Sequence, residues 1–241
     1  KENIQLYKKS TKKIKKLKII RPFFGKHKWL GGTLNYEKDH IYAIPSHSNY
    51  LLKIVPLTNE ISVIEIPSKG QFKYLRAILG KDKCIYGIPC FATSVLCLDP
   101  SNGKVTEFGN LPDNGWKWHG GALAPNGNIY GMPCNAENVL QINPSTKETT
   151  MIGTVPPGKN KWYGALLGRD GCIYGMPYSA TGVIRINPNT SDVRLIGKFP
   201  EGYKWHGGAV GKDGSIYGMP SHAETVLKIT PPLINNNNNN N

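Results

Sequence analysis

The sequence contains no apolar run long enough to cross a membrane as a helix, and its first residues lack the apolar core of a secretion signal. The five cysteines are odd in number and form no Cys-x-x-Cys pair, which excludes a zinc framework and a complete set of disulfides. Free thiols are typical of a reducing compartment. We therefore expect no membrane-spanning segment and favour an intracellular location, although the Asn189-Thr190-Ser191 motif leaves secretion open.

The signatures of several enzyme classes are also missing. No Gly-x-Ser-x-Gly motif, phosphate-binding P-loop or recurrent pair of carboxylates occurs in the chain. The body of the chain shows no stretch with helical periodicity either. The absence of helical periodicity favours an all-β protein. The absence of these motifs weighs against an enzyme without excluding one.

Acidic residues are scarce at the start of the chain, so the net charge of +14 is unevenly distributed. Residues 1–28 hold 11 of the 30 basic residues and a single acid, a balance of +10, whereas residues 29–241 carry only +4. We interpret residues 1–14 as a basic flexible arm. Residues 1–18 could attach the protein to nucleic acid or to an anionic surface, or the arm could simply be solvated.

The chain does contain a repeat, in five segments that begin near residues 28, 73, 117, 161 and 204. The leading aromatic residues follow one another at intervals of 45, 44, 44 and 43 residues; they are Trp29, Tyr74, Trp118, Trp162 and Trp205. Each segment contains β-branched and aromatic runs separated by turn signals such as Asn-Gly and Asp-Gly, which predict four short strands. Four strands in such a period are typical of one blade of a β-propeller.

The ends of the chain predict how the ring closes. The fifth repeat stops after its third strand, at Pro231-Pro232, and residues 15–20 align with the fourth strand of a blade. Ile20 lies nine residues before Trp29, just as Ile196 lies nine before Trp205. We therefore predict a five-bladed propeller over residues 15–232, in which strand 15–20 completes the last blade and closes the ring. An open arc from a larger propeller is the alternative, and the Asn tract at 233–241 is expected to be disordered.

The repeated unit, Asp-Gly-x-Ile-Tyr-Gly-x-Pro followed by Val-Leu-x-Ile-x-Pro, resembles the blades of the β-propeller superfamily, and the count of five is similar to that of tachylectin-type lectins. The resemblance covers about residues 15–232 and is architectural. The residue pattern of the repeat does not match the tachylectin, Kelch or WD signatures, so no lectin-like or Kelch-like activity follows from the resemblance.

Comparison of the five copies separates scaffold from variable positions. The Ile-Tyr pairs and the Pro that ends each second strand recur in every copy and are expected to form the frame. Propeller topology places the start of the first strand and the loop after this Pro on one face, which we take as the functional face. Five lysines precede the leading aromatics; they could hold an anion, or lie over the aromatic rings with their heads in water.

Candidate ligand-binding residues lie at positions that vary between copies. The residue after the leading aromatic is His119 in the third copy, Tyr163 in the fourth and His206 in the fifth, and Arg76 replaces a glycine in the second. Arg76 could anchor a carboxylate or phosphate, or pair with a nearby acid. Trp118 and Trp205 could stack on a ligand or wedge the blades together.

Four of the six histidines map to the same face, and His47, His206 and His222 would approach one another in a closed ring. Imidazoles that meet could bind zinc or act as acid and base. No carboxylate recurs beside them in the sequence, so we expect neither a metal nor a cofactor and assign no catalytic residue.

The sequence thus predicts a non-enzymatic binding module. Its ligand is expected to be a glycan, a small anionic ligand or a partner protein, bound on the loop face. A hydrolase or metal-dependent lyase at the channel mouth is one alternative, and attachment to nucleic acid through the basic arm is another.

Overall fold

The computed structural model describes residues 25–233, and all of its regular structure is β-strand. The first sheet contains β1 (Trp29–Asn35), β2 (His40–Pro45), β3 (Tyr50–Val55) and β4 (Glu60–Glu65). The second contains β5 (Tyr74–Leu79), β6 (Ile85–Pro89), β7 (Val95–Asp99) and β8 (Lys104–Phe108). The third contains β9 (Trp118–Leu123), β10 (Ile129–Pro133), β11 (Val139–Asn143) and β12 (Glu148–Ile152). The fourth contains β13 (Trp162–Leu167), β14 (Ile173–Pro177), β15 (Val183–Asn187) and β16 (Asp192–Ile196). The fifth contains β17 (Trp205–Val210), β18 (Ile216–Pro220) and β19 (Leu227–Ile229).

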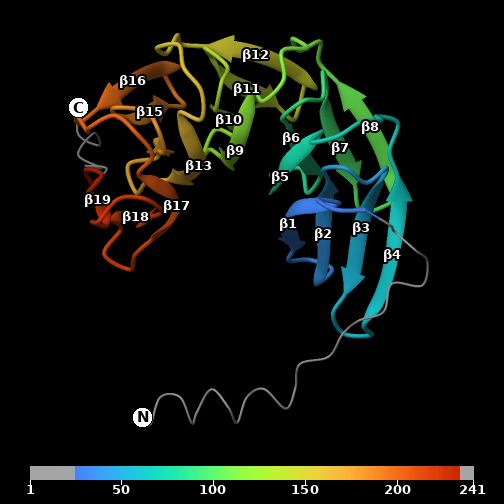
Figure 1. The fold of residues 1–241 in the computed structure, drawn as a ribbon. Helices are drawn as coiled ribbons and strands as arrows, with labels where there is room; N and C mark the ends of the chain where they lie inside the picture. The colour runs from blue at the N-terminus through green and yellow to red at the C-terminus, as the bar shows by residue number, and fades with distance from the viewer. Residues whose placement is uncertain (1–24, 234–241) are drawn as a thin grey trace, which may run out of the picture.

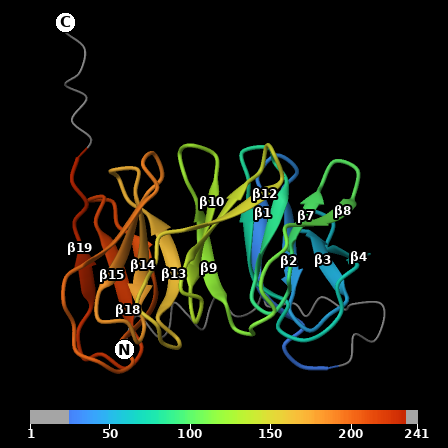
Figure 2. The same ribbon diagram turned by 90° about the horizontal axis from the view of Figure 1, so that it is seen from above.

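The prediction of an all-β propeller with five blades is confirmed. Every sheet is an antiparallel meander in which consecutive strands pair. The sheets follow one another around a central axis, with the first strand of each sheet innermost and the fourth outermost (Figure 1). Seen from the side, they stand next to one another, with connecting loops on two opposite faces (Figure 2). Within residues 25–233 there is no helix able to span a membrane.

The described sheets leave an opening between β1 and β17 (Figure 1). The fifth sheet has three described strands, as the repeat predicted, and the expected closing strand at 15–20 lies outside the described residues. Met219 in this sheet is 44% exposed, whereas its counterparts in the other sheets are fully buried; these are Ile44, Ile88, Met132 and Met176. The side of the fifth sheet is therefore not covered by any residue between 25 and 233.

The core consists of the repeated Ile-Tyr-Gly strands packed between neighbouring sheets. Tyr86, Tyr130 and Tyr174 are buried within it. A Cβ added to Gly87 would lie 2.9 Å from Ile44 of the preceding sheet, so glycine is required for this close approach. Burial of such side chains between sheets is the main stabilising contribution, because each large apolar side chain removed from water contributes about 2 kcal/mol.

The lysines before the leading aromatics are part of this scaffold. Lys73 is 2% exposed, and its Nζ donates to the backbone oxygens of Ser46, Ser48 and Gly70 at 3.0, 2.8 and 2.9 Å. Lys161 donates in the same way to Ala136 O and Pro156 O. Burial lowers the pKa of Lys73 to about 8. Lys161 Nζ does lie over the Trp162 ring, 5.7 Å from its centroid, as one of the two predictions expected. The ammonium groups of Lys73 and Lys161 do not lie in water, however, but donate to carbonyls of the preceding blade.

Candidate functional site

The start of each inner strand and the loop after each second strand lie together, as the topology predicted. The first backbone N–H of each loop donates to the carbonyl of the lysine that precedes the leading aromatic. The five bonds measure 2.7 to 2.9 Å and join Ser46 to Lys28, Cys90 to Lys73, Cys134 to Lys117, Tyr178 to Lys161 and Ser221 to Lys204. We call this side of the molecule the loop face.

A β-bulge next to each leading aromatic turns the following side chain toward the central axis. The pairing of the first two strands shifts register at this point in all five sheets, for example between Trp29 and Gly31 and between Trp205 and Gly208. A bulge leaves a residue out of the ladder and re-aims its side chain. The variable residue is therefore free of the sheet hydrogen bonding that constrains its neighbours.

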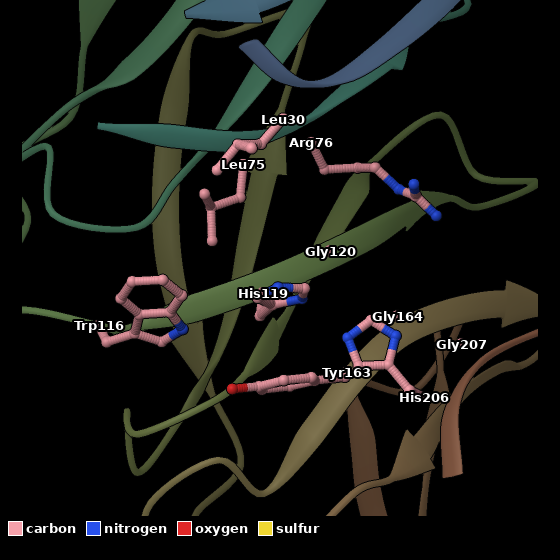
Figure 3. A pocket seen from close by; sticks show the side chains of 10 residues that line it. All are labelled: Leu30, Leu75, Arg76, Trp116, His119, Gly120, Tyr163, Gly164, His206 and Gly207. Carbon is pink, nitrogen blue, oxygen red and sulfur yellow. The ribbon is translucent and has the colours of Figure 1, made fainter. Parts of the chain in front are cut away.

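These five variable residues line one pocket of about 370 Å³ at the axis (Figure 3). Leu30 and Leu75, from the first two sheets, form an apolar side. His119, Tyr163 and His206, from the other three, form an aromatic side. Arg76 and Trp116 complete the side-chain lining, and Gly120, Gly164 and Gly207 contribute backbone. The structure thus brings four of the predicted binding residues together: Arg76, His119, Tyr163 and His206.

Arg76 is the cation of this pocket. The residue is exposed, and its guanidinium makes no hydrogen bond or ion pair with any residue in the described part of the chain. No acidic side chain is among the residues that line the pocket. At the equivalent position the third, fourth and fifth sheets have glycines with φ of +85°, +83° and +67°, a conformation that a side chain rarely adopts. Arg76 does not share this left-handed conformation. Gly31 of the first sheet does not either, but a Cβ added there would lie 2.5 Å from Leu75 O.

His119 is the central ring of the aromatic side. It stacks on Tyr163, with ring centroids 4.1 Å apart and planes at 13°, and it lies 5.9 Å from His206. Burial, followed by the electrostatic influence of the neighbouring His206 and Arg76, lowers the pKa of His119 to about 4. The imidazole is therefore neutral at neutral pH, and its buried Nδ1 has no hydrogen-bond partner within residues 25–233.

An aromatic column runs outward from the pocket along the loop face. Trp116, His119, Tyr163, Tyr178 and Tyr203 follow one another with planes at 10° to 21°. The sequence prediction missed Trp116 and Tyr203, which stand immediately before the repeated lysine. A signal was available, because this position is aromatic in four of the five copies: His27, Phe72, Trp116 and Tyr203.

The other predicted site residues lie away from the pocket. His47 packs against His27 and Phe72 in the first two sheets, with ring centroids at 5.4 and 4.3 Å. His222 contacts Tyr178 and Tyr203 in the fourth and fifth. The three histidines therefore do not meet as the closed ring suggested. Among residues 25–233 no three His, Cys, Asp or Glu side chains are placed to hold a metal ion.

The leading tryptophans act as wedges. Trp118 and Trp205 are 1% and 5% exposed, so their ring faces are not available to solvent. The indole N–H of Trp118 donates to Asn138 O at 2.9 Å, and that of Trp205 donates to Thr225 O at 2.6 Å. Neither side chain lines the central pocket.

The repeat is recognised by one family model, which matches residues 46–230 and is described as a repeat of unknown function, DUF6923. The chain belongs to this family. No curated protein matches the sequence significantly.

Solved structures share the architecture of the DUF6923 repeat. A streptogramin B lyase superposes with a TM-score of 0.69 at 19% identity, over 83% of this chain and 64% of that one. The virginiamycin B lyase of Staphylococcus aureus, in an inactive variant with quinupristin, gives 0.68 at 17% identity, over 88% and 74%. An auxiliary nutrient binding protein from Bacteroides thetaiotaomicron gives 0.58 at 14% identity, over 84% and 55%. The chain spans about two thirds of the length of the first lyase, and these likenesses establish the propeller fold alone.

Proposed function

We propose that this protein is a non-enzymatic binding module that takes a small anionic ligand into the axial pocket. The observation that carries the proposal is Arg76, an unpaired guanidinium among pocket residues that include no acid. A guanidinium forms paired hydrogen bonds with a carboxylate or phosphate, and these bonds strengthen where water is partly excluded.

The two sides of the pocket narrow the ligand class. Leu30 and Leu75 present apolar surface, and His119 and Tyr163 present ring surface. A ligand with an apolar body and one carboxylate satisfies both sides and Arg76 together. A volume of about 370 Å³ suits a molecule of this kind and is too small for a folded partner protein to enter.

The test uses benzoate and hexanoate as probes and benzamide and hexanol as their neutral counterparts, titrated by calorimetry or ligand-observed NMR. We expect the carboxylates to bind and the neutral molecules to bind at least tenfold more weakly. Arg76→Gln should remove this preference. Arg194→Gln is the matched control, because Arg194 lies on the outer strand β16, away from the pocket, and pairs with the exposed Asp192. Equal binding of acid and neutral probes would show that Arg76 is not an anion anchor.

A second candidate is a lyase at the same pocket. His119 and His206 lie 5.9 Å apart beside Arg76, so a neutral base and a cation are both present where a substrate would bind. The similarity in fold to streptogramin B lyases favours testing this chemistry first. Incubation with quinupristin, followed by mass spectrometry, would detect any product that the protein forms from it. Turnover that His206→Ala abolishes would support the lyase and count against a pure binding module.

A further inference from the structure

The outer end of the aromatic column lies on the loop face and is partly exposed. It consists of Tyr178, Tyr203 and His222, which we call the tyrosine ledge. Tyr203 stacks on Tyr178 with ring centroids 4.6 Å apart and planes at 10°, and Tyr203 is 48% exposed. His222 lies 5.5 Å from Tyr203 and 5.9 Å from Tyr178. Tyr203 therefore rests on one ring and keeps much of its surface in solvent.

Asn160 holds the ledge in place. Its Oδ1 accepts a hydrogen bond from the Tyr163 hydroxyl at 2.9 Å, and its Nδ2 donates to the Tyr203 hydroxyl at 3.4 Å. Its backbone N–H donates to Asn135 Oδ1 at 2.8 Å. Asn160 adopts φ of +56°, which Asn tolerates better than most residues. The rings are thus positioned before any ligand arrives, which lowers the entropic cost of binding.

The ledge results from an exchange that only the fourth copy of the repeat makes. This copy has Asn160 where the other four have an aromatic residue, and it has Tyr178 where the others have serine or cysteine. The ring is thereby moved from the position before the lysine to the loop after the second strand. The packing of the propeller frame is the same in all five copies, so it does not explain a substitution found in only one of them. The exchange in the fourth copy therefore indicates a ligand-binding role.

The charges around the ledge favour a neutral ligand. The exposed charged residues close to the ledge in the sequence are Lys159, Glu201 and Glu224, one basic and two acidic. The Lys204 ammonium is not available, because it donates to Ser179 O and Gly202 O. The remaining polar groups are uncharged hydrogen-bonding groups, including the Ser221 hydroxyl, which lies 3.1 Å from His222 Nδ1. A polyanion such as a nucleic acid would gain little here.

We propose that the tyrosine ledge binds a sugar ring of a neutral saccharide. A pyranose has an apolar C–H face, which packs against an aromatic ring, and a rim of hydroxyl groups, which suits amide, hydroxyl and imidazole partners. Tyr203 supplies the ring, while Asn160, Ser221 and His222 supply the polar rim. This site does not require Arg76 and is independent of the proposed anion pocket.

Ligand-observed saturation-transfer NMR with the methyl pyranosides of glucose, galactose, mannose and N-acetylglucosamine tests the proposal. We expect at least one to receive saturation at its ring C–H protons. Tyr203→Ala should weaken this saccharide at least tenfold, and Tyr203→Phe should retain most of the affinity because the ring remains. The matched control is Tyr36→Ala, because Tyr36 is 78% exposed in the turn between β1 and β2, away from the ledge.

Two results would overturn the sugar site. One is that none of the four pyranosides receives saturation from the wild-type protein. The other is that the signal persists in Tyr203→Ala while the thermal midpoint of that variant matches wild type. Arg76→Gln separates this site from the anion pocket, since it should abolish carboxylate binding and leave the pyranoside signal unchanged.

Discussion

Lys147 Nζ lies 3.2 Å from Asp82 Oδ2, although the two residues belong to neighbouring sheets. In the fourth sheet Asp170 pairs with Arg185 of its own sheet at 3.0 Å, and in the fifth Asp213 pairs with Lys228 at 3.2 Å. Arg185 and Lys228 stand opposite the repeated tyrosine; the second sheet has Cys97 there. The second sheet therefore lacks its own cation and receives one from the third.

Replacement of Lys147 by Met should loosen the junction between these two sheets. The change removes the ion pair with Asp82 and a hydrogen bond to the Tyr86 hydroxyl. Because both charges are partly screened by solvent, we expect a loss of about 1 kcal/mol in the free energy of unfolding. Urea unfolding measures it. Adding Cys97→Arg to the Lys147→Met variant should restore stability, because the arginine supplies the cation from within the second sheet. If stability is not restored, Lys147 does not replace a missing cation of that sheet.

The pH dependence of this junction follows from the same contacts. Burial tends to raise the pKa of Asp82, but hydrogen bonds from Tyr86 and Lys147 outweigh it and hold the pKa below its ordinary value. A carboxyl whose pKa is lowered by folding stabilises the native state above the unfolded pKa, and this contribution disappears as the pH falls through the folded value. Acid unfolding of Asp82→Asn should accordingly show a smaller loss of stability below pH 4 than wild type.

His119 should remain neutral to unusually low pH. Burial and the nearby charges lower its pKa to about 4, from an ordinary value near 6.5. Between these two values the unfolded chain binds a proton that the native protein does not, so stability should fall as pH drops through this window. NMR titration of the imidazole checks the pKa, and His119→Gln should flatten stability between pH 6.5 and 4. A titration midpoint above 6 for the His119 imidazole would show that this side chain is not buried as described.

Two equivalent lysines should respond differently to replacement by Met. Lys73 Nζ donates to three carbonyls, whereas the buried Lys117 Nζ has no hydrogen-bond partner within residues 25–233. Lys73→Met removes three hydrogen bonds, including the one to the buried Ser48 O, and should cost about 2 to 3 kcal/mol. Lys117→Met should cost less than about 1 kcal/mol. Thermal unfolding of both variants provides the comparison. Equal losses of stability in the two variants would mean that the hydrogen bonds from Lys73 to the carbonyls do not stabilise the protein.

Two glycines near the axis distinguish two costs of a Gly→Ala substitution, the clash with the next sheet and the strain of the left-handed backbone. Gly120 and Gly207 both have positive φ, but a Cβ on Gly120 would lie 2.9 Å from Gly164 Cα, and one on Gly207 meets nothing within 4 Å. Gly207→Ala should therefore cost only the left-handed conformation, about 1 kcal/mol. Gly120→Ala should cost about 2 kcal/mol more, because neighbouring backbones must separate. Chemical denaturation of the pair measures the difference.

The fold was predictable because the same strand and turn pattern recurs in all five copies of the repeat. The Ile-Tyr pairs, the turn signals and the constant spacing each require the same four-stranded sheet, and each copy supports the others. Arg76 and the pocket residues His119, Tyr163 and His206 were found by the opposite logic, as departures from the repeat. Their convergence followed from topology, since His119, Tyr163 and His206 occupy one position in equivalent strands and Arg76 occupies the next.

The details that were not predictable depend on contacts between sheets. Nothing in the sequence shows that the Lys73 ammonium turns back to carbonyls of the preceding blade, because its charge suggests solvent. The distance of His47 from His206 depends on the angle between successive sheets, which no single repeat encodes. Trp116 and Tyr203 were overlooked because the comparison of the copies began at the lysine and did not include the residue before it.

The bulge at the start of each inner strand has an evolutionary consequence. It uncouples one side chain per blade from the requirements of folding, so five codons, at 30, 75, 119, 163 and 206, can change independently while the frame stays intact. Gene duplication of such a blade would supply a new position of this kind with each copy. A repeat of this design can acquire a new ligand by point mutation, without a change in architecture.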